Sequence, residues 1–423
     1  MISLSERAKN ILLVFLVIVS IVLSFFMRYG LAGLYGSSAA AYGGREISPA
    51  VLSAVLKPED IIINFGGMDH MPVFSDPDYE SAWREFQNVI FSGGGNFTSV
   101  SREDFAVAMD YRSLTYKFSF PVPLAYFNEA NGKKYNLPIN TIKDVIILSG
   151  SSPTYYIYDG FDKYLRMNLG YKNNGIENII SINEDEPSLY STARDLGFTD
   201  SMDGDILMPL DPESIMFHIT GPKIPNKLDI NTLVSRYFDS GSMVRKIEEM
   251  PGDMVLTDGR KGLKVYKSGR LEYTYSTSSS ARVDDITAIK IASDFVIKHL
   301  PDMEGISLAG MEEEKDGYTI GYNVRHNGIH VYTKKQEYPI MVKVSGGRVV
   351  SMKSMSLGFV DKDRMANLQI SALDAMDISF KEDMKHWDEL RMCYLEDGGE
   401  IREAWRAVNN KKILYVDMKN GNV

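Results

Sequence analysis

The sequence predicts an α+β protein that has a single N-terminal transmembrane helix, a mixed N-terminal domain, and then smaller, duplicated helix-on-antiparallel-sheet modules. Three observations predict this class. An apolar stretch at 11–27 carries no charge and is long enough to span a membrane once. Strand-like alternation and helical periodicity both occur in residues 51–215. After residue 286 a helix followed by strands occurs twice, which indicates a duplication.

The apolar stretch is predicted to be a retained anchor. Arg7 and Lys9 precede it, which places residues 1–10 in the cytoplasm and the transmembrane helix at 11–28. The alternative is a signal peptide cleaved near the alanines at 39–41, but the apolar region of a signal peptide is usually shorter, about 7 to 15 residues. The sequence therefore predicts a single-pass protein of the cell membrane with a cytoplasmic N-terminus and an extracellular C-terminal ectodomain.

Two serines of the predicted helix, Ser20 and Ser24, are four residues apart and share one face. Small residues at this spacing allow two membrane helices to pack closely. Leu13, Leu16 and Val17 would then be free to contact lipid or a partner helix. An ordinary spanning sequence explains the same pattern, and both interpretations stay open.

Composition limits the function of the remaining chain. The 423 residues carry a formal net charge of -10, and lysine and arginine are scattered, which argues against nucleic-acid binding. The single cysteine, Cys393, cannot form an internal disulfide and is far from the position of a lipoprotein cysteine. An outward-facing chain without disulfides fits a Gram-positive type of envelope better than a eukaryotic secretory pathway.

Residues 29–50 are small and glycine-rich and are predicted to be a tether. The N-terminal α+β domain follows at 51–215. Its helix is expected at 79–90, where Trp83 and Phe86 share a face. Its strands are expected at 61–65, 114–120 and 145–149.

Prolines at 209, 212, 222 and 225 mark the start of a middle domain, predicted at 216–285. A helix is expected at 230–238. Two strands, at 263–266 and 271–275, flank a Lys-Ser-Gly-Arg turn and predict a hairpin.

The C-terminal region, 286–423, is predicted to hold the duplicated helix-plus-sheet unit. Both copies end in a similar pattern, in which Gly347 corresponds to Gly421. The first copy is expected to have a helix at 287–300 and strands at 318–324, 330–333 and 340–352. The second is expected to have a helix at 370–384 and strands at 391–395, 403–408 and 413–418.

Motifs for nucleotide or metal binding are not found. The three glycines at 93–95 lack the lysine of a phosphate-binding loop and are interpreted as a turn. His326 and His330 are separated by the turn-forming Asn327 and Gly328, which argues against a zinc site. The acidic segment at 200–205 does not place ligands at the positions of a calcium loop and is interpreted as solvated.

Catalytic motifs also fail. Residues 267–269 resemble the Lys-Ser/Thr-Gly element of penicillin-binding proteins, but the chain has no Ser-x-x-Lys nucleophile. The acidic run at 312–314 is interpreted as a solvated face. We therefore predict no catalytic residue, no metal site and no cofactor, and a protein that is not an enzyme.

One longer pattern carries a family resemblance. Residues 233–249 read LVSRYFDSGSMVRKIEE, and residues 254–276 read MVLTDGRKGLKVYKSGRLEYTYS. Together with KPEDIIIN at 57–64, LTYKFSFPVPLAYF at 114–127, the anchor and the duplication, this pattern resembles the YycH (WalH) family. Thr257, Asp258 and Gly259 belong to its central motif and are expected to form a structural turn in which glycine permits a positive φ.

The resemblance implies a membrane-anchored, extracytoplasmic and non-enzymatic regulator of the WalK/WalR two-component system, which controls cell-wall homeostasis. Its implied partners are a WalK-like sensor histidine kinase and a YycI-like single-pass protein, contacted partly through the transmembrane helix. The alternative from another class is an anchored envelope protein that binds or hydrolyses cell-wall polymer.

Overall fold

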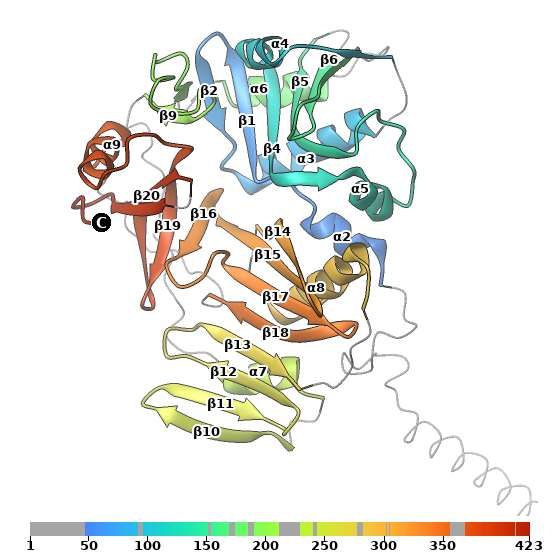
Figure 1. Cartoon of the computed structure of the whole chain (residues 1–423), viewed down its shortest axis with the longest axis vertical. Coiled ribbons are helices and arrows are strands. Elements are labelled where there is room, and N and C mark those ends of the chain that lie inside the picture. Colours follow the sequence, from blue (N-terminus) through green and yellow to red (C-terminus); the bar gives the residue numbers. More distant parts are fainter. Residues whose placement is uncertain are drawn as a thin grey trace, which may run out of the picture.

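The structure is a computed structural model that describes residues 47–91, 96–150, 154–168, 174–184, 190–210, 229–239, 243–276, 282–301, 303, 305–355, 369–410 and 412–423. The predicted cytoplasmic segment, the transmembrane helix and most of the tether lie outside these residues. Within the described ranges, no helix is both long and apolar enough to cross a membrane. The eight helices and two large sheets in these ranges make an α+β fold, as predicted (Figure 1).

The first lobe, residues 47–210, is built on a nine-stranded sheet with the order β3-β7-β6-β5-β4-β1-β2-β8-β9. Neighbouring strands in this order are antiparallel. The strands are β1 (Asp60–Gly66), β2 (Asp69–Pro72), β3 (Phe97–Ser99), β4 (Ser113–Pro123), β5 (Thr141–Leu148), β6 (Thr154–Tyr158), β7 (Tyr164–Asn168), β8 (Tyr190–Thr192) and β9 (Leu207–Pro209). The three strands predicted in this region correspond to β1, β4 and β5.

Five helices belong to this lobe: α2 (Pro49–Val55), α3 (Asp76–Ile90), α4 (Arg102–Val107), α5 (Leu124–Asn131) and α6 (Gly175–Ile182). The predicted helix at 79–90 is α3, which begins earlier because Pro77 and acidic residues suit a first helical turn. Phe86 of α3 is fully buried and lies 5.0 Å from the ring of Tyr116 on β4. The aromatic face seen in the sequence therefore forms the core of this lobe.

The second lobe, residues 229–423, is built on a twelve-stranded sheet with the order β10-β11-β12-β13-β18-β17-β15-β16-β19-β20-β21, and β14 pairs with β15 off this path. The strands are β10 (Arg245–Met250), β11 (Asp253–Thr257), β12 (Lys261–Val265), β13 (Leu271–Tyr275), β14 (Ser307–Glu314), β15 (Gly317–His326), β16 (Ile329–Thr333), β17 (Ile340–Ser345), β18 (Arg348–Ser354), β19 (Glu389–Asp397), β20 (Glu400–Asn409) and β21 (Lys412–Asp417).

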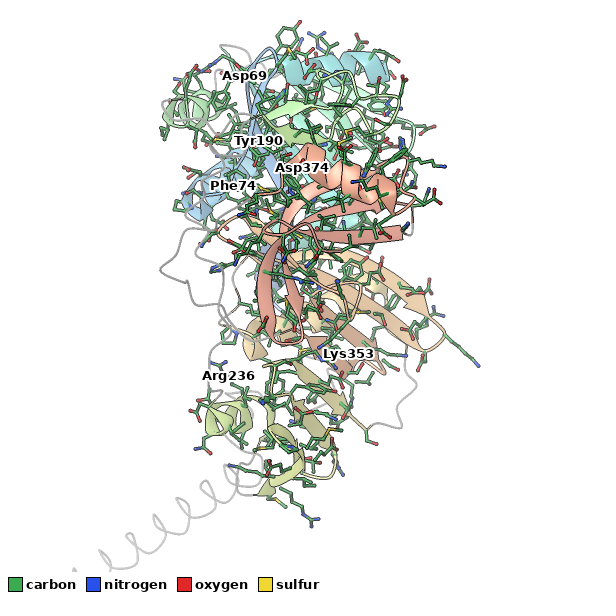
Figure 2. The ribbon with its side chains drawn as sticks, turned by 90° about the vertical axis from the view of Figure 1, so that its left-hand side faces the viewer. Asp69, Phe74, Tyr190, Arg236, Lys353 and Asp374 are labelled. Carbon is green, nitrogen blue, oxygen red and sulfur yellow. The ribbon has the colours of Figure 1, made fainter. Side chains whose placement is uncertain are left out.

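Three helices belong to the second lobe: α7 (Ile230–Tyr237), α8 (Asp285–His299) and α9 (Ala372–Lys381). They confirm the predicted helices, and α9 is shorter than expected at both ends because Ser371 forms a capping box with Asp374 and the helix stops at Lys381. In Figures 1 and 2, α9, marked by Asp374, lies beside the first lobe, and α7, marked by Arg236, lies at the far end of the second lobe.

Two units of the second lobe each begin with a helix that precedes paired antiparallel strands. In the first, α8 is followed by β14–β18, and β15 pairs with both β14 and β17; in the second, α9 is followed by β19, β20 and β21, which pair in sequence. The turn glycines Gly347 and Gly421 have similar φ angles of 70° and 73°. The hairpin strand β16 joins the units because it pairs antiparallel with β15 and parallel with β19. The middle strands β10–β13 extend the same sheet through the β13–β18 pair.

Two apolar clusters of described residues span both lobes. One apolar core continues from the first lobe into α8, where the Tyr126 hydroxyl donates to Asp285 at 2.9 Å and Lys290 pairs with Glu129 at 2.6 Å. A second apolar cluster joins the segment 193–208 of the first lobe to the C-terminal unit, through Met202, Ile206, Met208, Trp387 and Trp405 among others. The space between these two clusters holds the candidate site.

Candidate functional site at the junction of the two lobes

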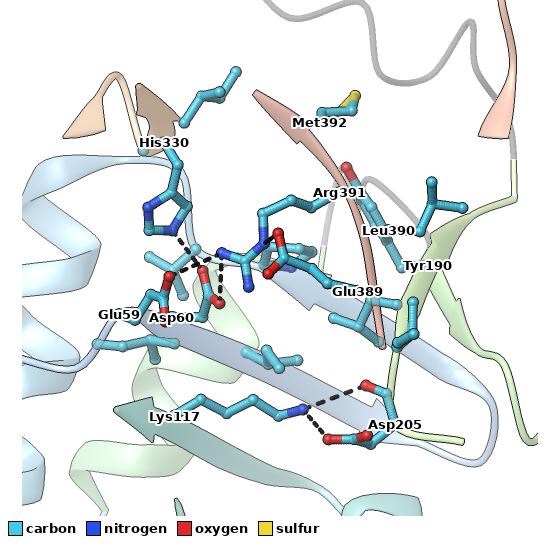
Figure 3. Close-up of a pocket in the computed structure, with 18 of the residues that line it drawn as sticks. Glu59, Asp60, Lys117, Tyr190, Asp205, His330, Glu389, Leu390, Arg391 and Met392 are labelled. Carbon is cyan, nitrogen blue, oxygen red and sulfur yellow. Dashed lines mark hydrogen bonds and ion pairs between the residues drawn. The ribbon is translucent and has the colours of Figure 1, made fainter. Parts of the chain in front are cut away.

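A row of alternating charges crosses one end of the first sheet. Asp60 on β1 is the cross-strand partner of Lys117 on β4, and Lys117 is the partner of Asp144 on β5. Directly opposed residues of antiparallel strands share a face, so the three side chains line up there. All three border a cavity of about 370 Å³ between the lobes. Asp60 and Lys117 are shown in Figure 3.

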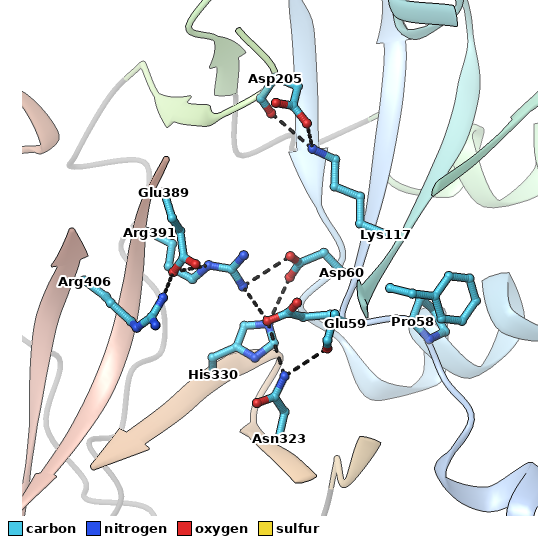
Figure 4. A network of polar contacts seen from close by, with 12 residues as sticks. Pro58, Glu59, Asp60, Lys117, Asp205, Asn323, His330, Glu389, Arg391 and Arg406 are labelled. Carbon is cyan, nitrogen blue, oxygen red and sulfur yellow. Dashed lines mark hydrogen bonds and ion pairs between the residues drawn. The ribbon is translucent and has the colours of Figure 1, made fainter. Parts of the chain in front are cut away.

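The second lobe supplies the groups that face Asp60. His330 of β16 lies with Nε2 2.9 Å from Oδ1 of Asp60, and Arg391 of β19 lies with Nη1 3.2 Å from Oδ2 (Figure 4). Arg391 also reaches Glu59, 3.4 Å away, and its Nε lies 3.0 Å from Glu389. Arg406 of β20 pairs with the same Glu389. A chain of opposite charges therefore runs from the start of β1 into the second sheet.

These contacts change the acidity of their members. Burial alone would raise the pKa of Asp60, but Arg391, His330 and Arg325 together outweigh it and hold the pKa far below the usual value. Burial likewise opposes ionisation of Glu389, and Arg391 and Arg406 lower its pKa. The carboxylates are thus kept ionised by the second lobe. The side chain of Asp60 is 28% exposed to the cleft, so the stabilisation is partly screened by water.

Contacts other than ion pairs also join the two lobes at this junction. The Asn323 amide donates to Glu59 at 3.3 Å and to the Ser119 hydroxyl at 3.1 Å, which links β15 to the first sheet. The guanidinium of Arg325 stacks 3.6 Å from the ring centroid of Tyr79 on α3. Each of these pairs joins one lobe to the other.

Asp144 is held differently from Asp60. Burial raises its pKa to about 6, although Lys117 and Lys143 act in the opposite direction. Its Oδ1 is buried and has no hydrogen-bond partner among the described residues. Lys117 instead pairs with Asp205, whose pKa it lowers. The row therefore contains one aspartate whose pKa is lowered and one whose pKa is raised to about 6.

The cavity has mixed chemistry. Besides the charged groups it is lined by apolar side chains such as Leu390 and Met392, and by Tyr190, whose buried hydroxyl has no hydrogen-bond partner in the described part of the chain. A neighbouring cavity of about 820 Å³ shares Lys117, Asp144 and Asp205 with it. Charged and apolar walls together suit a ligand or a peptide segment that carries both kinds of group.

The structure places the motif residues away from this cleft. Thr257, Asp258 and Gly259 form the β11–β12 turn, in which Asp258 accepts from the backbone of Arg260 and Lys261 at 2.9 and 2.8 Å, and Gly259 has a φ of 95°. The proposed helix residues Leu13, Leu16, Val17, Ser20 and Ser24 lie outside the described residues.

Two segments with no function predicted from the sequence border the cleft. His330 follows the turn at Asn327 and Gly328 and binds Asp60. Asp205 belongs to the acidic segment interpreted as solvated; it is 55% exposed and pairs with Lys117. Among the described residues, no three histidine, cysteine or acidic side chains are grouped so that they could hold a metal ion.

Comparison with known proteins adds one finding. No family profile matches the chain, and no curated protein matches it by sequence. The crystal structure of YycH from Bacillus subtilis matches over 86% of this chain and 96% of that chain, with a TM-score of 0.60. The chain has the YycH fold. The resemblance predicted from the sequence is thereby confirmed for the fold, at 15% sequence identity. The described part of this chain contains both lobes and the charged cleft between them.

Proposed function

We propose that this protein is a membrane-anchored, extracytoplasmic regulator of a sensor histidine kinase that controls cell-wall homeostasis. The observation that carries the proposal is the YycH fold, which extends over 86% of the chain. The uncharged stretch at 11–27 supports an anchor that precedes the two-lobed ectodomain. The proposed partners are a WalK-like kinase and a YycI-like single-pass protein, and no enzymatic activity is part of the proposal.

The cleft suggests how the ectodomain acts. Its two sides belong to different lobes and are joined by contacts such as Asp60–Arg391 and Asp60–His330. Polar and ionic contacts of this kind can be exchanged for contacts with a ligand or an envelope partner. A partner that binds one arrangement of the lobes better shifts the population toward it, by no more than its difference in affinity. That shift would reach the kinase through helix contacts in the membrane.

The membrane part of the proposal is tested by replacing residues 11–28 with an unrelated spanning helix of equal length. Kinase output is then measured as transcription of a cell-wall gene under the control of the partner response regulator. We expect output to return to the level of a strain without the protein, although the variant is still anchored. Unchanged output, with equal amounts of both proteins in the membrane, would overturn the role of the helix.

The partners are tested by purifying the tagged full-length chain from detergent-solubilised native membranes, beside the helix-replacement variant. We expect a histidine kinase and a second single-pass protein to copurify with the native chain and to be depleted with the variant. Recovery of cell-wall fragments with both proteins, and of a kinase with neither, would instead support a wall-binding protein and overturn the regulator.

The cleft is tested separately with Asp60→Asn in the full-length chain. We expect kinase output to shift because the lobes lose the Arg391 and His330 contacts, while the amount of protein in the membrane is unchanged. Asp69→Asn, on an exposed residue at the β1–β2 turn, is the matched control. Equal output from the native chain and both variants would show that the cleft does not transmit the signal.

A further inference from the structure

Strand β10 forms one end of the twelve-stranded sheet and has an open side. It pairs with β11, and no other described strand pairs with it. All six of its residues, Arg245–Met250, are exposed. Figure 1 shows it at the end of the second lobe farthest from the first lobe. Such an edge presents backbone N–H and C=O groups that a further strand can pair with.

This edge is also rich in exposed apolar side chains. Met243 is 72% exposed, Ile247 48% and Met250 65%. Single exposed apolar residues are common on soluble proteins, but these three fall within eight positions on and beside one open strand. Apolar side chains on an unpaired edge favour a strand–strand contact over a solvated surface.

The order of charges along β10 specifies which strand fits. Two cations, Arg245 and Lys246, precede Ile247, and two anions, Glu248 and Glu249, follow it. The pattern is antisymmetric about Ile247. A second β10 aligned antiparallel, with the two Ile247 residues opposite each other, places each lysine opposite a glutamate of the other copy. A parallel alignment would instead place like charges opposite each other, which is destabilising.

We propose that two copies of this protein associate through their β10 strands, in antiparallel alignment about a twofold axis at Ile247. Charged edge strands ordinarily discourage pairing, but this order of charges selects one orientation of the same strand. The β10–β11 ladder is regular from Arg245 to Glu248 and shifts before Met250, so the Lys246–Glu248 pairs lie in its regular part. Both copies contribute the same strand edge to the interface, as twofold symmetry requires.

This association goes beyond the proposed kinase regulation and does not depend on it. The anchor proposed above would place two copies in one membrane, where their effective concentration is high and a short strand pair is sufficient to hold them together. The interface lies on the second lobe at the end away from the cleft, so the cleft of each copy stays accessible (Figure 1).

Cysteine cross-linking of the full-length chain in native membranes tests the alignment. In Ile247→Cys the two cysteines lie directly opposite each other, where antiparallel strands hold Cα atoms about 4.5 to 5.5 Å apart, within the range of a disulfide. We expect a disulfide-linked dimer under mild oxidation. The chain's own Cys393 is buried and does not compete. Ile413→Cys, at an exposed position of the strand β21 at the other end of the sheet, is the matched control and should stay monomeric.

Charge reversal in the Ile247→Cys background tests the specificity. Lys246→Glu puts glutamate opposite glutamate at two symmetric positions, and Glu248→Lys puts lysine opposite lysine, so each should reduce cross-linking about tenfold. When the two reversed chains are coexpressed with different tags, every pair becomes complementary again. We expect the mixed dimer to form at the level of the unreversed protein.

Three results would overturn the proposal. The first is cross-linking of Ile247→Cys no greater than that of Ile413→Cys. The second is equal cross-linking in the reversed and unreversed proteins, which would indicate contact without this charge alignment. The third is a disulfide to a different membrane protein instead of to a second copy, which would assign the edge to another partner.

Discussion

Gly328 of the second lobe lies against the backbone of Phe74 in the first lobe. A Cβ atom built on Gly328 would lie 2.3 Å from the Phe74 carbonyl oxygen and 2.4 Å from its Cα. Gly328 has a φ of 73° and ends the β15–β16 turn, two residues before His330. The turn therefore sets the distance between the lobes beside the His330–Asp60 contact. This close approach is possible because Gly328 has no side chain.

Gly328→Ala is expected to destabilise the protein by about 2 to 4 kcal/mol, because the methyl group adds a clash with Phe74 to the strain of a positive φ. Gly67→Ala is the matched control, since Gly67 has a φ of 69° and nothing lies within 4 Å of its added Cβ. It should lose only about 1 kcal/mol. Urea unfolding of both variants measures the difference, and equal losses would contradict the contact between the lobes.

Asp60→Asn is expected to lower the free energy of unfolding by about 1 to 3 kcal/mol at pH 7, because two charge-assisted contacts are weakened. The pKa of Asp60 is lowered in the folded state, so its contribution is present above the unfolded pKa, near 3.9, and is lost as the pH falls below it. The difference between native protein and variant should therefore shrink in acid. A difference that is constant from pH 7 to pH 3 would contradict this assignment.

Asp144→Asn is expected to change the free energy of unfolding at pH 7 in the opposite direction from Asp60→Asn. The folded pKa of Asp144 is raised from 3.8 to about 6, so ionisation opposes folding and the stability of the native protein falls as the pH rises from about 4 to 6. With allowance for partial exposure, the variant should be more stable than the native protein by about 1 to 2 kcal/mol at pH 7. At pH 4 the two should be equal. Loss of stability at pH 7 would show that the Lys117 attraction outweighs burial.

Cys393 is expected to resist alkylation in the folded protein. Its side chain is 2% exposed on β19, and burial raises the pKa of the thiol, so little thiolate is available. Iodoacetamide should label it slowly under native conditions and fast in concentrated urea, as measured by mass spectrometry. Rapid native labelling would show that β19 opens locally.

Elements with clear periodicity could be predicted from the sequence. The alternation in 114–120 and the apolar face of 287–300 appear as β4 and α8. β10 was not predicted, because its charged sequence has no apolar alternation and it is held in the sheet by pairing with β11. α5 was not predicted; it is a short helix that begins directly after Pro123, beyond the strand predicted at 114–120.

The cleft could not be predicted, because its partners are brought together by tertiary structure. Arg391 and Glu59 are 332 positions apart and meet only when the lobes pack. The sequence feature that could have indicated the cleft is the placement of single charges at the ends of apolar strands. The pair Glu59 and Asp60 directly precedes the three isoleucines at 61–63. Asp144 directly precedes Val145 and the isoleucines at 146 and 147. A charge there indicates a polar contact but does not identify the partner.

The joint between the repeated units has a mechanical consequence. β16 and β19 are connected by three backbone partner pairs, from Val331 to Thr333, whereas β19 and β20 share nine. A buried hydrogen bond of 2.9 Å from Thr333 to Glu396 reinforces this short joint. Under tension on the C-terminus, the sheet should therefore tear first between β16 and β19. The last unit would come away with its own strands still paired and take Arg391 with it, while α8 and His330 keep the rest of the second lobe in contact with the first lobe.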